Sequence, residues 1–168
     1  MGAGKVFAII GGLLGVLSVV LYYIAPDILN LWNLNAPLVP LKVYLGGFGA
    51  WSGEWLATPF PIEYAGDLIL LIVGVLTIGG GVITFIGGAA GSKTVGILGG
   101  IILLAGPILL LVALIAKLGI FGDTIVPLMG DVNLLFGSIF GVADWGIGIG
   151  SYLAIGGGIL GIVGGATT

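Results

Sequence analysis

Four long apolar runs, interrupted by glycine but by no charged side chain, dominate the pattern of this sequence. They cover residues 6–25, 68–90, 95–116 and 147–163. A helix needs about 20 apolar residues to cross a bilayer, and none of the runs alternates apolar and polar positions as a membrane-barrel strand does. The sequence therefore predicts an all-α integral membrane protein, a single domain over residues 1–168 with four transmembrane helices.

Two long segments, residues 26–67 and 117–146, connect these spans on one side of the membrane and are themselves apolar. Connections of this length without structure of their own are uncommon in compact domains. We therefore expect the two segments to fold together into an outer cap, with short β-strands in part of it.

The clearest strand signal in the outer cap lies in the first segment. Val39, Leu41, Val43 and Leu45 alternate with more polar positions that include Lys42, the period expected of a half-buried strand. Lys42 and Tyr44 are expected on the opposite face. Two prolines, Pro37 and Pro40, restrict this strand to a sheet edge or to its own first residues.

The second segment gives a different prediction. The stretch "DVNLLFGSIFGVADW", residues 131–145, indicates a short interfacial or re-entrant helix rather than a strand. The side chains expected to bury against lipid or the helix bundle are Leu134, Leu135, Ile139 and Phe140.

Composition supports the membrane prediction and excludes several kinds of site. Hydrophobic residues make up 59% of the chain and charged residues 7%, far below the usual quarter. His, Cys and Arg are absent, so the usual ligand sets of zinc, haem and iron–sulfur centres are missing, and we expect no cofactor and no metal. The net charge of −3 argues against a nucleic acid partner. The absence of Cys and Gln is typical of a thermophile.

The few charges predict an orientation. Lys5 and Lys93 lie on one side of the predicted spans. All seven carboxylates lie on the other side with Lys42 and Lys117. Short cytoplasmic loops usually retain lysine, so we place both termini in the cytoplasm and the protein in the cell membrane, as a multi-pass protein. The carboxylates expected outside are Asp27, Glu54, Glu63, Asp67, Asp123, Asp131 and Asp144.

The carboxylates do not form an ion pathway, because no Asp, Glu or Lys lies inside a predicted span. Asp67 and Asp144 precede the second and fourth spans, where a carboxylate caps free N–H groups. A cation site shared by outer carboxylates is the alternative. Glu54 and Glu63 are expected to be solvated or paired with Lys42.

The chain contains 35 glycines, many of them four residues apart within the spans. Small residues at this spacing let two membrane helices approach closely. The partner helix belongs either to the same chain or to another subunit, and the triplets at 79–81 and 156–158 favour contacts on two sides. The predicted helix-packing positions are Gly11, Gly15, Gly80, Gly88, Gly96, Gly100, Gly157, Gly161 and Gly165.

The tryptophans gather in the outer segments. Trp and Tyr prefer the headgroup level, where an apolar ring and a polar group are both satisfied. We therefore predict that four tryptophans anchor the outer cap: Trp32, Trp51, Trp55 and Trp145.

The order of spans and loops, with Trp32 followed by Gly49, Ala50 and Trp51, resembles the claudin and peripheral-myelin-protein type of tetraspan protein. Those proteins carry a Trp and a later Gly-Leu-Trp on a small extracellular sheet. The cysteine pair that follows this motif in the family is absent here, as is the nearby basic residue. The resemblance implies a non-enzymatic protein that associates laterally in the membrane.

These observations predict a structural, self-associating protein whose partners are the lipid bilayer and either copies of itself or other membrane subunits. An accessory subunit of a larger membrane enzyme or respiratory complex, without a cofactor, is one alternative. A channel formed between subunits is the other. No catalytic residue is predicted.

Overall fold

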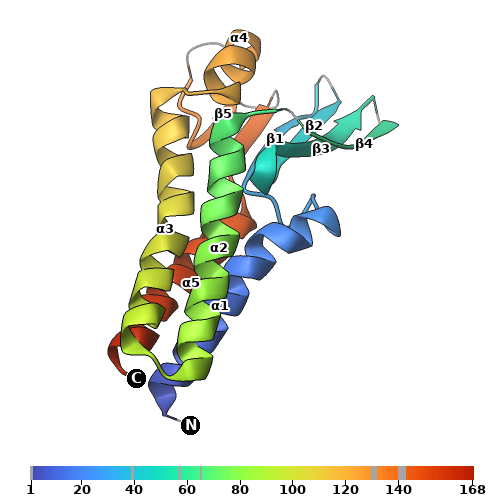
Figure 1. The fold of residues 1–168 in the computed structure, drawn as a ribbon. Helices are drawn as coiled ribbons and strands as arrows, with labels where there is room; N and C mark the ends of the chain where they lie inside the picture. Colours follow the sequence, from blue (N-terminus) through green and yellow to red (C-terminus); the bar gives the residue numbers. More distant parts are fainter. Residues whose placement is uncertain (1, 39, 57, 65, 130–131, 140–142) are drawn as a thin grey trace.

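The computed structural model consists of a helix bundle with a β-sheet at one end (Figure 1). It describes residues 2–38, 40–56, 58–64, 66–129, 132–139 and 143–168. Val39, Asp131 and Phe140, to which the sequence assigned positions in the cap, lie outside the described residues.

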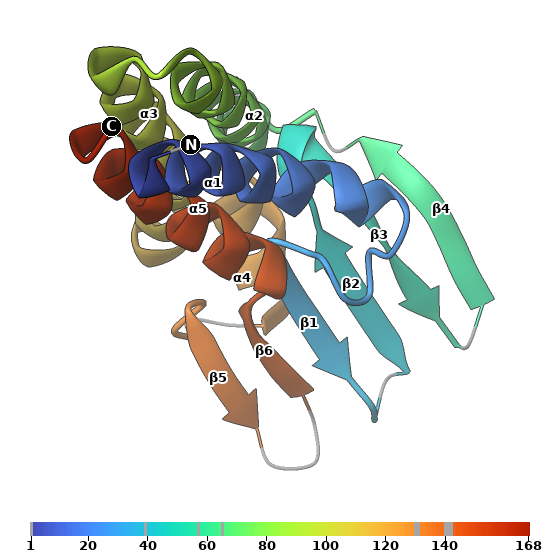
Figure 2. The same ribbon diagram turned by 90° about the horizontal axis from the view of Figure 1, so that it is seen from below.

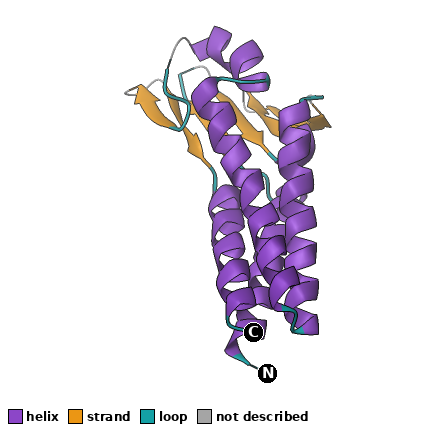
Figure 3. Ribbon diagram, turned by 60° about the vertical axis from the view of Figure 1, so that its left-hand side comes forward, coloured by secondary structure: helices purple, strands orange, loops and turns teal. Residues whose placement is uncertain are grey.

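Four helices are long and apolar enough to cross a membrane, as predicted. They are α1 (Ala3–Val20), which a short 3-10 turn extends over Leu21–Tyr23, α2 (Leu68–Ala90), α3 (Lys93–Ala116) and α5 (Ile149–Ala166). Both termini and the tight turn between α2 and α3 lie at the end of the bundle opposite the sheet (Figure 3). This arrangement indicates a multi-pass membrane protein.

The four helices form a ring in which each helix has two neighbours. Helix α1 packs against α2 and α5, and α3 packs against the same two helices on the other side. Hydroxyl groups buried between the helices bond to the preceding turn of their own helix: Thr77 donates to the Val73 carbonyl at 2.7 Å and Thr84 to the Gly80 carbonyl at 2.7 Å. In the part of the chain that the structure describes, every buried side-chain nitrogen or oxygen has a hydrogen-bond partner.

The outer segments form one antiparallel sheet of six strands in the order β4-β3-β2-β1-β6-β5. The first segment supplies β1 (Trp32–Ala36), β2 (Leu41–Leu45), β3 (Ala50–Trp55) and β4 (Thr58–Tyr64). The second supplies β5 (Phe136–Ile139) and β6 (Ala143–Ile147). The two segments join where β1 pairs with β6, with Trp32 opposite Ile147. Seen from below, the sheet projects to one side of the helices (Figure 2).

The two faces of the sheet differ in polarity. Trp32, Leu34, Val43, Leu45 and Trp145 are buried on one face, in a cluster that includes residues of α2 and α3. A π-helical turn over Phe121–Ile125 and the short helix α4 (Val126–Met129) follow α3, and Phe121 and Ile125 belong to the same cluster. By strand register, the opposite face carries the polar side chains Asn33, Asn35, Lys42, Tyr44, Ser52, Glu54 and Asp144.

The outer cap confirms one sequence prediction and contradicts two. The strand over residues 41–45 is confirmed, with Leu41, Val43 and Leu45 on the face opposite Lys42 and Tyr44. The all-α class is wrong, because the cap is a six-stranded sheet. The predicted helix in residues 131–145 is also wrong, because its described part contains strands β5 and β6.

Of the two aspartates predicted to cap a helix N-terminus, only Asp67 does so. Asp67 does cap α2, with its Oδ1 accepting a hydrogen bond of 2.8 Å from the Leu70 N–H. Asp144 does not cap α5, because it lies in β6, paired with Asn35, and the residue before the helix is Gly148. The strand continues past Asp144 because β1 holds it by hydrogen bonds, a constraint that the local sequence does not carry.

Candidate functional site

The junction between cap and bundle is organised around Asp67. While its Oδ1 caps α2, its Oδ2 accepts a hydrogen bond of 2.7 Å from the backbone N–H of Ile120. The carboxylate thus also holds the turn that follows α3. Gly119 makes this approach possible, since it has a φ of +59° and a Cβ there would collide with the Asp67 carboxylate.

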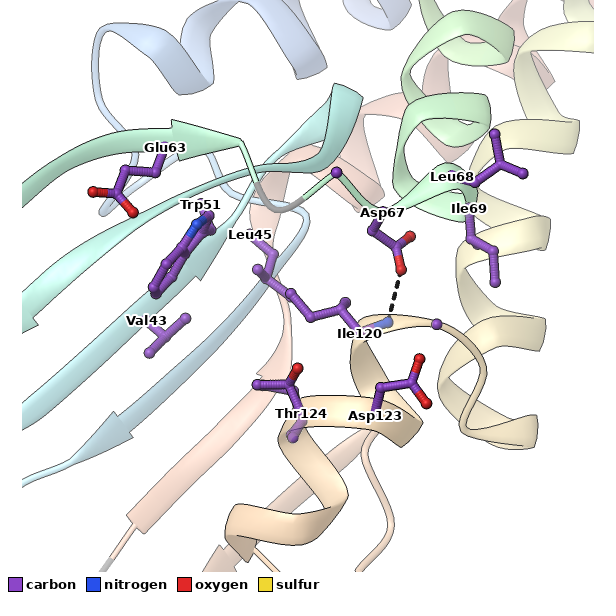
Figure 4. A pocket seen from close by; sticks show the side chains of 13 residues that line it. Val43, Leu45, Trp51, Glu63, Asp67, Leu68, Ile69, Ile120, Asp123 and Thr124 are labelled. Atoms are coloured by element: carbon purple, nitrogen blue, oxygen red, sulfur yellow. Dashed lines mark hydrogen bonds between the residues drawn. The ribbon is translucent and has the colours of Figure 1, made fainter.

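A cavity of about 770 Å³ opens beside this junction, between the apolar face of the sheet, the start of α2 and the turn after α3 (Figure 4). We call it the acidic pocket. Its floor is apolar and includes Val43, Leu45 and Ile120, and its polar side chains include three carboxylates. The full lining is Val43, Leu45, Trp51, Glu63, Gly66, Asp67, Leu68, Ile69, Gly119, Ile120, Asp123, Thr124 and Ile125.

Two predicted anchors, Trp32 and Trp145, hold the second outer segment. The Trp32 Nε1–H donates to the Leu134 carbonyl at 2.8 Å, and the Trp145 Nε1–H donates to the Asn133 carbonyl at 2.6 Å. Trp32 is fully buried, and its ring meets the ring of Phe121 edge-on, with 5.8 Å between the centroids. Both side chains therefore fasten the loop before β5 to the sheet.

The other two tryptophans, Trp51 and Trp55, lie on β3. Trp51 is half-buried against the apolar core and lines the acidic pocket. Trp55 is 54% exposed at the far end of the hairpin, so it does not hold the cap together from inside. Trp51 and Trp55 therefore lie in different environments, although they are only four residues apart.

Three large exposed apolar residues, which we call the apolar tip, lie at the ends of the β1–β2 and β3–β4 hairpins: Leu38, Trp55 and Leu56. Leu38 is 68% exposed and Leu56 64% exposed. The tip joins the ends of two hairpins, because the Leu56 N–H donates to the Pro40 carbonyl at 2.8 Å. Leu56 has a φ of +51°, a conformation that is costly for a residue with a Cβ.

The polar face of the sheet carries an ion pair. Lys42 Nζ lies 2.9 Å from Glu54 Oε2, as the sequence allowed. The hydrogen bond from Glu54, together with its charge, raises the pKa of Lys42 above the usual value. Burial raises the pKa of the neighbouring Tyr44 hydroxyl, against a smaller opposing effect of Lys42. The side chains of Lys42 and Glu54 are both partly exposed to solvent, so this ion pair contributes little to stability.

The predicted helix-packing glycines face other helices of the same chain. A Cβ at Gly11 would meet the backbone of Gly157 and Gly161, and one at Gly80 would meet the backbone of Leu103. At all nine predicted positions, a Cβ would come so close to an atom of another helix that this neighbour would have to shift. The nine are Gly11, Gly15, Gly80, Gly88, Gly96, Gly100, Gly157, Gly161 and Gly165.

No protein-family model matches this sequence, and no curated protein matches it.

One polar contact that the sequence does not indicate lies where α1 meets the sheet. The buried Tyr22 hydroxyl donates to the Tyr44 carbonyl at 2.8 Å and lies 3.0 Å from Ser52 Oγ. In the sequence, Tyr22 is marked only by its place beside Tyr23 at the end of the first apolar run, and nothing in its neighbourhood indicates a partner 30 residues away.

A second such contact joins the start of α5 to the first outer segment. The Ser151 hydroxyl donates to the Leu31 carbonyl at 2.9 Å, and the Gly150 N–H donates to the Asn30 carbonyl at 2.9 Å. The first turn of α5 is therefore bonded to the chain just before β1. These contacts, like those of Tyr22, hold the sheet against the helices.

Proposed function

We propose that this chain is a structural membrane protein that associates with copies of itself through its outer cap. It spans the cell membrane four times, with both termini in the cytoplasm. The position of two lysines supports this placement, because Lys5 and Lys93 both lie at the end of the bundle that carries the termini.

The observation that carries the proposal is the apolar tip. Leu38, Trp55 and Leu56 are large, more than half exposed, and located on the cap rather than on the spans. A leucine at a positive φ, where glycine or asparagine is usual, costs about 1–2 kcal/mol. Strain of this kind is tolerated where the side chain has a use. Contact with another protein would remove the tip from water.

A second copy of this chain suits the apolar tip better than an unrelated protein, whose contact surface could lie at any height above the membrane. Copies in one bilayer are held at the same depth by their spans, so their tips stand at the same height above the membrane. Equivalent patches can then meet across a two-fold axis along the membrane normal, as in most homodimers. Each contact buries the same three side chains on both sides.

Disulfide cross-linking tests this proposal directly, because the chain has no cysteine and any introduced thiol is unique. Leu56→Cys should form a covalent dimer when membranes are mildly oxidised. Ser138→Cys, on the polar face near the other edge of the sheet, is the matched control and should stay monomeric. A dimer band of equal yield from both variants would show random collision and overturn the proposal.

The mass of the extracted wild-type chain separates this function from its rivals. A homo-oligomer that dissociates when Trp55→Ala and Leu56→Ser are combined supports self-association. Co-purification with unlike chains in fixed ratio would instead favour an accessory subunit of a larger complex. A monomer at all lipid-to-protein ratios would contradict both.

A further inference from the structure

We infer that the acidic pocket binds a cationic amphiphile, an ammonium group carried on an apolar chain. This binding is a function separate from self-association and does not depend on it, since the lining of the pocket includes no residue of the apolar tip.

The height of the pocket relative to the spans points to an amphiphilic occupant. Leu68 and Ile69, the first two residues of α2, line the pocket, and Gly119 follows α3 by only three residues. Leu68 is 66% exposed, so the apolar edge of the pocket is continuous with the lipid-facing surface of α2. A ligand that reaches the pocket from the bilayer can leave its chain on this surface and place its polar head beside one of the rim carboxylates.

The charge of the pocket selects the sign of that head. Glu63, Asp67 and Asp123 line it, and no lysine is among the lining residues. Lys117, the nearest lysine along the chain, lines a separate cavity with Leu114 and Asn133. Because concave apolar walls focus the field of fixed charges, the pocket attracts cations. The N-terminus of α2 would favour an anion, but the Asp67 carboxylate already occupies that position.

The spacing of the carboxylates favours an organic cation over a metal ion. In the part of the chain that the structure describes, no three acidic side chains are placed to hold one metal. Figure 4 shows Glu63 on β4 and Asp123 in the turn after α3 on opposite sides of the pocket, with Leu45 and Ile120 between them. A volume of about 770 Å³ accommodates a methylated ammonium and the first part of its chain.

Trp51 provides the second element of ammonium recognition. It lies directly opposite Glu63 in the pairing of β3 with β4, so an aromatic ring and a carboxylate are neighbours on one wall. The face of a tryptophan attracts an ammonium group, while the carboxylate supplies the full opposite charge. The apolar floor contacts the methyl groups, which a hydrated metal ion would not use.

Titration with decyltrimethylammonium tests this inference, using the full chain in a neutral maltoside detergent and calorimetry as the readout. The wild-type chain should bind about one equivalent saturably. Combining Glu63→Gln with Asp123→Asn should weaken binding about tenfold or more, since each removed charge acts in a concave, partly apolar site. Trp51→Leu should also weaken binding.

The control removes the same charge from elsewhere in the cap. Glu54→Gln with Asp144→Asn takes two carboxylates from the polar face of the sheet and should leave the affinity unchanged. Decyl sulfate should not compete, and tetramethylammonium, which lacks the chain, should bind far more weakly. Asp123→Lys, a single exposed change, places a cation in the pocket and should abolish binding even if the double variant unfolds.

Three results would overturn the inference: no saturable binding to the wild-type chain, equal weakening by the control variant, or equal affinity for decyl sulfate. The second would indicate attraction to the net charge alone, and the third would indicate apolar partitioning alone.

Discussion

The Asp67 carboxylate and the backbone N–H of Ile120 are joined by a hydrogen bond of 2.7 Å across 53 positions of the chain. The other carboxylate oxygen caps α2. One side chain therefore fixes the start of one span relative to the turn after the next. This link also sets the shape of the acidic pocket, which both segments line.

Asp67→Ala should destabilise the protein by about 2–4 kcal/mol, combining a lost helix cap with a lost hydrogen bond to a charged acceptor. Asp67→Asn should cost less, since the amide oxygen can still accept one bond. Denaturant unfolding in detergent measures both. Asp123→Ala, an exposed neighbour, should change stability by no more than about 0.5 kcal/mol. Equal unfolding curves for Asp67→Ala and the wild-type chain would show that this link is not stabilising.

Tyr22→Phe should loosen the attachment of the sheet to α1. The change removes one hydroxyl and leaves the Tyr44 carbonyl and the buried Ser52 hydroxyl without this partner. We expect a loss of about 1–3 kcal/mol and faster proteolysis within residues 26–67, with the chain still in the membrane fraction. Tyr152→Phe, at a 53% exposed position on α5, is the control. Identical proteolysis of the two variants would contradict this role.

Trp32→Phe and Trp55→Phe should differ sharply in their effect on stability. The first leaves a cavity in the core and removes the donor to the Leu134 carbonyl, which together cost about 2–4 kcal/mol. The second changes a side chain that is 54% exposed and should leave the unfolding midpoint almost unchanged. Thermal unfolding in detergent compares the pair. A larger loss from Trp55→Phe would mean that the cap is held from its tip.

Gly156→Ala and Gly157→Ala test whether glycine is needed at adjacent positions of α5. A Cβ at Gly156 would meet nothing within 4 Å, whereas one at Gly157 would lie 2.6 Å from the Gly11 carbonyl oxygen. Gly157→Ala should therefore push α1 and α5 apart and lower the melting temperature. Gly156→Ala should be neutral or stabilise by up to about 1 kcal/mol through helix propensity. A destabilising Gly156→Ala in detergent-solubilised oligomers, but not in monomers, would reveal a contact between subunits there.

Gly161→Leu against Val163→Leu extends this comparison to a larger side chain. A Cβ at Gly161 would lie 2.6 Å from Thr84 Cγ2, on α2, while Val163 is 44% exposed. Gly161→Leu should lose thermal stability before it loses any partner, because the crowding is within one chain. Val163→Leu should behave as the wild type. Dissociation of a stably folded Gly161→Leu protein would instead place this glycine between subunits.

Stability of the sheet should fall at alkaline pH. The folded-state pKa of Lys42 is raised by Glu54, and that of Tyr44 is raised by burial. Both groups hold their protons more tightly in the folded state, so their contribution is complete below the unfolded values near about pH 10. It is lost as the pH rises through the folded-state values.

The midpoint of denaturant unfolding, measured from about pH 8 to about pH 11, should follow this loss of stability. Glu54→Gln should remove the part due to Lys42 and flatten the profile, without abolishing it. A profile that stays level for the wild-type chain, or one that is unchanged in Glu54→Gln, would contradict this assignment.

The sequence predicts the helices well because each span carries its own signal. The run from Leu68 to Ala90 needs no distant partner to be recognised, and Asp67 before it indicates the cap. Strand β2 was also predictable, since Leu41, Val43 and Leu45 alternate with polar residues within five positions. These features depend only on local pattern.

Strands β5 and β6 were not predictable in the same way. Gly137 and Gly146 carry no side chain to mark a face, and apolar residues occur on both faces of β5 and β6, including Phe136 and Trp145. Their strand state comes from pairing with β1, about 110 positions earlier in the chain. The acidic pocket also depends on long-range contacts, because the sheet that carries Glu63 and the turn that carries Asp123 meet only in the folded chain.

The pairing of β1 with β6 also sets an order of events during synthesis. Strands β1 to β4 leave the ribosome before α2, so this meander can form while the later helices are still being made. Its β1 edge then remains open until β6 and α5 arrive, and an open strand edge is a template for wrong pairing. The last span and the strand before it therefore complete both the cap and the bundle. A chain truncated before Ala143 would leave the edge of β1 unpaired and prone to aggregation at the membrane surface.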